Sequence, residues 1–219
     1  MQIKVDLKIF IAILIFLLTE QLNIYIVFML FAIIHELGHI LTGIILGFKP
    51  KNIEVLPIGI SACFYMQCDD YNKKINYANR FVLKKVIISC AGPITNFIIA
   101  IIFYFFDFSI FNISREFIIY TNLIIGIFNL IPIYPLDGGR IIKNILHIKI
   151  GLKKSYKYTK IIANLSIIIL TIFSSMAILY LKNISIVLIL IYLWGIVIIQ
   201  NKKYESKMNI YKMLEKNEV

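Results

Sequence analysis

Long apolar segments alternate with short polar ones along the 219 residues of this chain. A transmembrane helix needs roughly 20 predominantly apolar residues. Segments of this kind lie at 7–22, 24–48, 86–106, 117–135, 161–181 and 184–200. The pattern predicts an all-α polytopic membrane protein with six transmembrane helices in a domain of residues 1–200, followed by a short cytoplasmic tail at 201–219.

The first apolar segment has a second interpretation, as a removable signal peptide, because Lys4 and Lys8 precede its apolar residues. Signal peptides end in a cleavage site of small residues. No such site follows this segment. We therefore expect residues 7–22 to remain as a spanning helix.

The longest polar interval, residues 49–80, separates the second expected helix from the third. Within it, Asn52–Met66 has alternating and β-branched residues, interrupted by Pro57 and Gly59. This pattern is typical of short strands or a hairpin. Bare strand edges cannot face lipid, so we expect the hairpin at the membrane interface or against protein that lines a cavity. It is either a plain surface hairpin or an edge that contacts substrate.

The composition excludes a soluble domain, since 60% of the residues are hydrophobic and the mean hydropathy is +0.85. The net charge of +11 could indicate a nucleic-acid partner, but its distribution does not. With a cytoplasmic N-terminus, 21 of the 23 Lys and Arg residues fall on the cytoplasmic side, and only Arg115 and Lys182 lie outside. We therefore expect a multi-pass protein of the bacterial inner (cell) membrane, with both termini cytoplasmic, a basic face near anionic lipid headgroups and no nucleic acid.

The second expected helix carries the motif His35-Glu36-Leu37-Gly38-His39. Ionisable side chains inside lipid are rare and usually functional. On a helix, His35 and His39 lie one turn apart on the same face, so both imidazoles can bind one Zn²⁺, and Glu36 lies beside them as a general base. The alternative is a pair of packed histidines, but a carboxylate buried in hydrocarbon costs several kcal/mol unless it is protonated or paired.

A catalytic zinc ion has three protein ligands and a fourth position for water, so one ligand must come from another element. The third-ligand candidates are Asp137, His147, Cys90 and Glu54. Asp137 is the best placed, because two prolines end the fourth helix near Ile131 and leave an extended chain that can reach the depth of His39. His147 falls in a basic segment, where a solvated role is expected. Cys63, Cys68 and Cys90 have no metal-ligand spacing.

This donor set favours hydrolysis of a peptide bond, with Glu36 moving the proton of an activated water to the departing amine. A substrate helix must unwind first, because an intact helix engages its carbonyls in hydrogen bonds. Asn129 or Asn96 could hold the opened strand. For Asn96, which lies in an apolar segment, hydrogen bonding between helices is the alternative.

Three separated motifs match one family: His35-Glu36-x-x-His39, Ala91-Gly92-Pro93-x-x-Asn96 and Asn129-x-x-Pro132-x-x-x-Leu136-Asp137-Gly138. On these motifs the chain resembles the site-2 proteases, the intramembrane zinc metalloproteases. The resemblance implies that His35, His39 and Asp137 bind Zn²⁺ and that Glu36 is the catalytic base. It also implies that the segment after the second span helps to admit substrate.

The six-span plan with cytoplasmic termini resembles the branch that contains the stage IV sporulation protease, which processes pro-sigma-K in spore-forming bacteria. Members of that branch often have a C-terminal CBS domain, for which the 19 residues after Gln200 are too few, so regulation by ATP is not expected. The stretch Pro57-Ile58-Gly59-Ile60 also lacks the second glycine common in the family. The chain has no insert of the size of a PDZ domain, which argues against the periplasmic-stress branch.

Pro-sigma factor maturation is therefore the expected role, with cleavage of an anti-sigma factor or a leftover signal peptide as alternatives. The partners expected are the lipid bilayer, a membrane-associated protein substrate and, as a candidate, a membrane inhibitor or regulatory protein. A catalytically silent scaffold or a metal transporter is the alternative of a different class. Transport would require polar positions along a path through several spans, whereas the ionisable groups here cluster at one depth.

Overall fold

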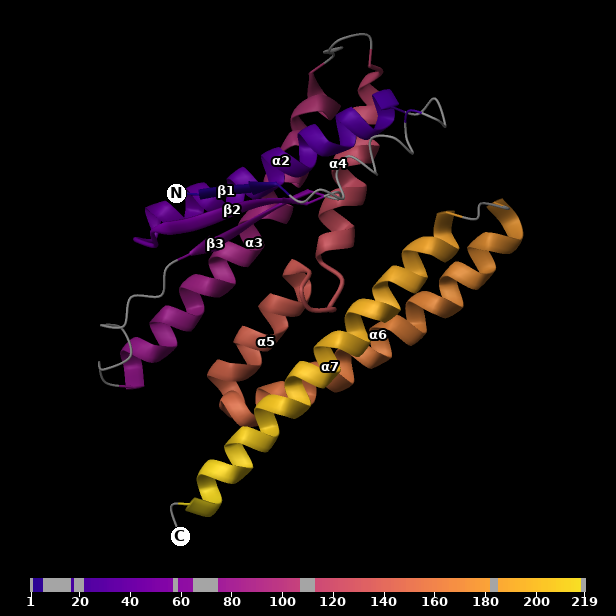
Figure 1. The fold of residues 1–219 in the computed structure, drawn as a ribbon. Helices are drawn as coiled ribbons and strands as arrows, with labels where there is room; N and C mark the ends of the chain where they lie inside the picture. The colour runs from indigo at the N-terminus through magenta and orange to yellow at the C-terminus, as the bar shows by residue number, and fades with distance from the viewer. Residues whose placement is uncertain are drawn as a thin grey trace. The chain divides into compact units, whose positions relative to one another are not determined.

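The computed structural model describes residues 2–5, 17, 22–56, 59–64, 75–106, 113–181 and 185–217. These residues form two compact units, Met1–Asn129 and Leu130–Val219 (Figure 1). Almost all of the first predicted span, 7–22, lies outside the described residues. The division into a domain of residues 1–200 and a tail stays a prediction.

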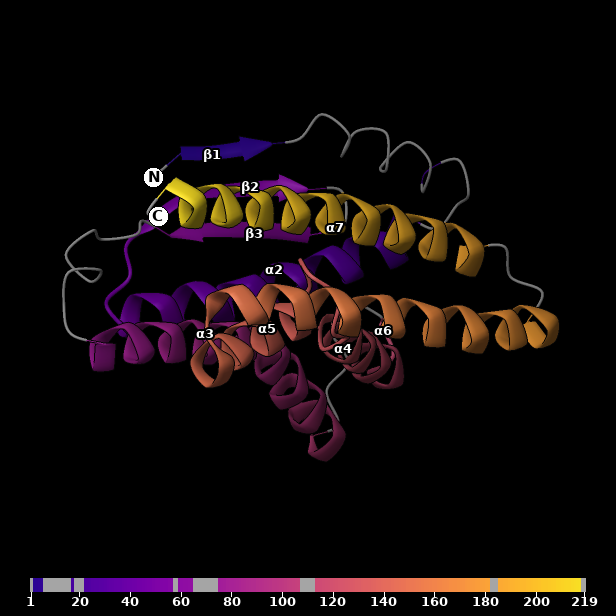
Figure 2. The ribbon, with the colours of Figure 1, turned by 90° about the horizontal axis from the view of Figure 1, so that it is seen from below.

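The first unit combines three helices with a small sheet. Its helices are α2 (Leu22–Ile45), α3 (Ile75–Phe105) and α4 (Arg115–Asn129), and its strands are β1 (Gln2–Val5), β2 (Pro50–Leu56) and β3 (Gly59–Phe64). The sheet has the order β1-β2-β3, and Figure 2 shows it on one side of α2 with α3 on the other side.

Strands β2 and β3 lie where the sequence predicts strands or a hairpin between the second and third helices. They pair in antiparallel register, with Glu54 opposite Ser61, whereas β1 pairs with β2 in parallel. Residues 57 and 58, which connect β2 to β3, lie outside the described part of the chain. A Cβ on Gly43 of α2 would meet the ring of Phe64, so glycine allows β3 to approach this helix.

Small residues also allow the three helices of this unit to pack closely, as in many membrane proteins. A Cβ on Gly38 of α2 would overlap the side chain of Thr95 in α3, and one on Gly126 of α4 would lie 3.0 Å from the ring of Phe97. The apolar core between α2 and α4 comprises Val27, Phe31, Ile118 and Ile125.

The second unit consists of α5 (Asp137–Ile150), α6 (Leu152–Leu181) and α7 (Ser185–Asn217), and α6 and α7 run antiparallel (Figure 1). Two side-chain hydrogen bonds join α6 to α7: Asn201 Nδ2 donates to Asn164 Oδ1 at 2.8 Å, and Lys160 donates to Glu205. The Lys160 ammonium holds the pKa of the Glu205 carboxyl below its ordinary value.

Three helical stretches of the described chain are long and apolar enough to cross a membrane: Asn23–Ile45, Asn79–Phe105 and Leu152–Met176. They overlap the predicted spans 24–48, 86–106 and 161–181. The molecule is thus mainly helical with three candidate spans, and the count of six stays a prediction.

The fourth predicted span, 117–135, is shorter than a full crossing as a helix. Helix α4 ends at Asn129 after 15 residues. At 1.5 Å per residue these cover about 22 Å of a hydrocarbon core that is ~30 Å thick. The prolines that follow cannot continue the helix, as the sequence predicts.

The segment after α4 folds back onto the first turn of α5. The Leu136 N–H donates to the Ile133 carbonyl at 2.9 Å, and Ile133 is completely buried. A Cβ on Gly138 would overlap the backbone carbonyl of Leu130, and one on Gly139 would overlap the backbone of Tyr134. The glycine pair therefore permits a backbone-to-backbone contact that no other residue allows.

We predict that Gly138→Ala destabilises the protein by about 1–3 kcal/mol, because the new methyl group overlaps a backbone atom that cannot rotate away. The midpoint of thermal unfolding in detergent micelles checks this. The matched control is Gly195→Ala in α7, where no atom lies within 4 Å of the added Cβ. That variant should be unchanged or stabilised by up to ~1 kcal/mol, and equal stability of both variants would contradict the packing argument.

Candidate metal site

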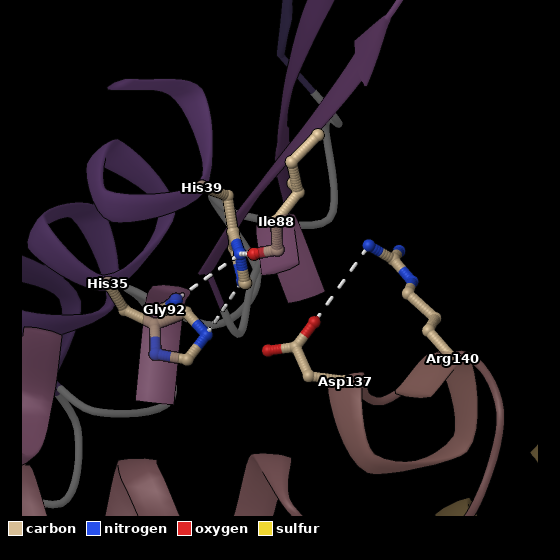
Figure 3. Close-up of polar contacts among 6 residues, drawn as sticks. All are labelled: His35, His39, Ile88, Gly92, Asp137 and Arg140. Carbon is tan, nitrogen blue, oxygen red and sulfur yellow. Dashed lines mark hydrogen bonds and ion pairs between the residues drawn. The ribbon is translucent and has the colours of Figure 1, made fainter. Parts of the chain in front are cut away.

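The two histidines of helix α2 lie in the interior of the first unit. His35 and His39 are 5% and 4% exposed, and Glu36 is 8% exposed. Their Nε2 atoms lie 3.2 Å apart, with the rings almost perpendicular (Figure 3). The structure thus brings together the pair that the sequence motif predicts, one helical turn apart on a buried face.

The hydrogen bond at Nδ1 of His39 determines which ring nitrogen carries the proton. This atom lies 2.6 Å from the carbonyl oxygen of Ile88 in α3 (Figure 3). A carbonyl can only accept, so Nδ1 must be the donor and Nε2 of the neutral ring keeps its lone pair. The Gly92 N–H, 3.3 Å from the same nitrogen, makes only a longer secondary contact.

His35 has an equivalent contact through a side chain, since its Nδ1 lies 2.5 Å from Oδ1 of Asn96. Here too the oxygen accepts and Nδ1 donates, so the Nε2 lone pair is available. Two imidazoles that face each other through lone pairs repel unless a cation lies between them. In metal sites, a ligating histidine almost always donates its other ring N–H in this way.

The separation of the two nitrogens fits a zinc ion. Two nitrogens bound at ~2.0–2.1 Å to a tetrahedral ion lie about 3.3–3.4 Å apart, close to the 3.2 Å between the Nε2 atoms here. The rings need no large movement to bind one ion. The donor set, two neutral imidazoles with a carboxylate next to them in the chain, also matches the ligand preference of Zn²⁺.

Helix α3 approaches the histidines at Gly92. A Cβ on this residue would lie 2.6 Å from His35 Nε2 and would also overlap the His39 ring. The next residue, Pro93, is fully buried and has no N–H to donate within the helix. A side chain at position 92 would therefore occupy the space that a bound ion needs.

Asp137, the third ligand predicted from the sequence, belongs to the second unit. It is the first residue of α5 and its carboxylate is buried, 4% exposed. Arg140 Nη1 lies 3.9 Å from Oδ1, a weak ion pair one turn along the helix (Figure 3). The N-terminal end of a helix favours a negative charge, so an aspartate is well suited to this position.

The remaining predicted site residues differ in their surroundings. Asn96 is completely buried and hydrogen-bonded at both ends of its amide, and Asn129 is half-buried and donates to the Ile125 carbonyl at 3.0 Å. Substrate contact by either stays a prediction. Of the other third-ligand candidates, His147 and Cys90 are partly buried, and the side chain of Glu54 lies outside the described part.

One residue near the site was missed by the sequence analysis. Asn122 of α4 is completely buried and its Oδ1 accepts a hydrogen bond of 2.8 Å from Asn96. The available signal was an amide within the apolar segment 117–135, the same signal that singled out Asn96. Because amides in membrane helices commonly join helices, the signal alone does not point to the histidines.

This chain is similar to curated proteins and to solved structures. Over 150 residues this chain is 37% identical to a zinc metalloprotease of Methanocaldococcus jannaschii, covering 65% of this chain and 39% of that protein. It is 24% identical over 144 residues to the stage IV sporulation protein FB of Bacillus subtilis, covering 64% and 46%. The chain thus spans less than half the length of these curated relatives.

The solved structure of a site-2 protease from Methanocaldococcus jannaschii is similar over nearly the whole fold. The TM-score is 0.63 at 26% sequence identity, and the match covers 91% of this chain and 90% of that chain.

We predict that Gly92→Ala lowers the affinity for Zn²⁺ by at least about tenfold, because the methyl group displaces both ligand rings. Competition with a chromophoric chelator measures the affinity. The control is Gly126→Ala, which also crowds a helix contact but meets only the ring of Phe97. It should keep the wild-type zinc affinity. Wild-type affinity in Gly92→Ala would show that the space beside the two rings is not a metal site.

The family profile described as Peptidase family M50 matches residues 23–112 and 112–173. The matched residues include the His35–His39 motif, the approach of α3 at Gly92 and the first turn of α5. These segments are most of the chain. The protein is therefore an integral membrane protein that belongs to peptidase family M50, the family of the site-2 proteases.

Proposed function

We propose that this protein is a zinc-dependent intramembrane endopeptidase that hydrolyses a peptide bond of a membrane-associated protein near the cytoplasmic face. The observation that carries the proposal is the pair of buried Nε2 atoms, 3.2 Å apart, which keep their lone pairs in neutral rings that donate through Nδ1. Membership of peptidase family M50 supports the same chemistry. So does the likeness to a protein named a zinc metalloprotease.

In this proposal His35, His39 and Asp137 hold the ion. Two imidazoles alone leave zinc short of the three protein ligands of a catalytic site. A carboxylate supplies the third, and Asp137 is a buried carboxylate in a segment that resembles a motif of the family. Its weak contact with Arg140, at 3.9 Å, is compatible with a second partner of opposite charge.

A zinc ion bound here would polarise the scissile carbonyl and activate a water molecule. Glu36 follows the ligand His35 in the chain and is buried, so its carboxylate acts in a site of low polarity. There it accepts the proton of the attacking water and returns it to the nitrogen of the departing amine. In the same proposal the amide of Asn129 holds the opened substrate strand, because both ends of the Asn96 amide are engaged with His35 and Asn122.

The proposal places six spans in the bacterial inner membrane with both termini in the cytoplasm. The distribution of Lys and Arg supports this orientation, since only Arg115 and Lys182 would face outward. His39 lies nine residues before the cytoplasmic end of the expected span 24–48. At 1.5 Å per residue, a substrate would then reach it roughly 13 Å below the cytoplasmic surface.

For the biological role we propose maturation of a pro-sigma factor in sporulation. The similarity to the stage IV sporulation protein FB supports this role at 24% identity. Cleavage of an anti-sigma factor or of a leftover signal peptide uses the same chemistry on a different substrate. The partners in each case are a membrane-associated protein and the lipid bilayer, with a membrane inhibitor or regulatory protein as a further candidate.

We predict that Glu36→Gln reduces cleavage by about 10²–10⁴-fold, because glutamine cannot accept the proton of the attacking water. The protein is co-expressed separately with a tagged pro-sigma factor, an anti-sigma factor and a leftover signal peptide. The cleaved fraction of each is measured on immunoblots. The substrate cleaved by the wild type identifies the role.

Metal analysis of the purified proteins completes this experiment. Glu36→Gln should retain zinc, whereas Asp137→Ala should lose both zinc and cleavage, since Asp137 is the proposed third ligand. Undiminished cleavage by Glu36→Gln would remove Glu36 from the mechanism. A wild-type protein that binds no zinc would overturn the proposed activity.

A further inference from the structure

We propose that Asn122 is a positioning residue that acts through Asn96 to hold His35 with its Nε2 lone pair facing the metal. This inference rests on the proposed function, because it gives His35 its role as a ligand. The carrying observation is a continuous chain of hydrogen bonds across three helices, from His35 in α2 through Asn96 in α3 to Asn122 in α4.

The direction of the chain is fixed at its far end by a backbone group. Asn122 Nδ2 lies 2.9 Å from the carbonyl oxygen of Ile118, one turn earlier in α4. A carbonyl oxygen only accepts hydrogen bonds, so the amide nitrogen of Asn122 must face it. The amide oxygen of Asn122 then has to face the other way, toward Asn96.

Each link then orients the next one. Because Asn122 presents its oxygen at 2.8 Å, Asn96 must donate with Nδ2 and can offer only its own oxygen to His35. At the final link of 2.5 Å, His35 must therefore carry its proton on Nδ1. The one carbonyl of Ile118 thus determines, through two amides, which nitrogen of His35 carries the proton in the neutral ring.

Burial gives this arrangement its energetic weight. Asn96 and Asn122 are both 0% exposed. Away from water, an amide that loses its partner costs about 1–3 kcal/mol, so reversal of either side chain is unfavourable. A rotated Asn96 would also present N–H groups to a nitrogen that already carries a proton.

The two histidines differ in how they are held. His39 donates to the backbone carbonyl of Ile88, which no substitution of a side chain removes directly. His35 donates through Nδ1 to a side-chain oxygen, that of Asn96. Substitution of the amides should therefore affect one ligand and leave the other in place.

The test measures zinc affinity by competition with a chromophoric chelator, in purified full-length protein in detergent, with Zn²⁺ as the only ligand. We expect Asn96→Ala to weaken the affinity by about 10–100-fold. Asn122→Ala should also weaken the zinc affinity, by no more than Asn96→Ala does. The double variant should match Asn96→Ala, because the first substitution already disconnects Asn122 from His35.

Two further variants separate positioning from packing. Asn122→Asp, protonated at this buried position, can still donate to the Ile118 carbonyl and accept from Asn96, and should keep an affinity close to wild type. Asn164→Ala removes an amide hydrogen bond of the same 2.8 Å length between α6 and α7, without a link to His35. It should lower thermal stability and leave the zinc affinity unchanged. If Asn122→Ala does not fold, Asn122→Leu preserves the volume of the side chain and replaces it.

Nitrogen NMR of the metal-free protein gives a readout that a packing role would not change. Labelled histidine yields signals from only three residues. The wild type should show His35 protonated at Nδ1 alone, and Asn122→Ala should add a population protonated at Nε2. Wild-type zinc affinity and an unchanged His35 signal in Asn122→Ala would overturn the positioning role while leaving the proposed function intact. Absence of zinc binding in the wild type would instead overturn the proposed function.

Discussion

The site is built around two imidazoles whose Nε2 atoms lie 3.2 Å apart inside a membrane protein, where the lone pairs of two neutral rings protonated at Nδ1 repel each other. A neutral ring can move its proton from Nδ1 to Nε2 only by giving up the buried hydrogen bond that Nδ1 donates. A divalent cation converts this repulsion into two coordinate bonds. The features around the pair serve this arrangement: glycine at position 92 leaves the space, and α3 supplies both hydrogen-bond acceptors.

The membrane makes such an arrangement both costly and stable. Buried polar groups must find partners within the protein because lipid supplies none. Accordingly, the amides of Asn96 and Asn122 are engaged along with the histidines rather than left to solvent. The same helices pack through Gly38 and Gly126, so that α2, α3 and α4 approach closely enough for short side chains to connect them. In the first unit, close packing of the helices therefore also allows the buried polar side chains to form hydrogen bonds with one another.

Much of the site was predictable from the sequence, because helical periodicity alone places His35 and His39 on one face. The strands after α2 and the end of the fourth helix near Ile131 were also readable, from residue alternation and from proline. The partners of the histidines were not. Which carbonyl accepts from His39, and whether Asn96 faces His35 or substrate, depends on how helices distant in sequence are rotated and packed. Asn122 was missed for the same reason, since one amide in an apolar segment does not indicate which side chain it will contact.

X-ray absorption at the zinc edge of the purified wild-type protein tests the central claim most directly. The account predicts a first shell of nitrogen and oxygen at ~2.0–2.1 Å, with the outer-shell scattering of two imidazoles. A first shell containing sulfur, at ~2.3 Å, or scattering from a single imidazole would contradict it.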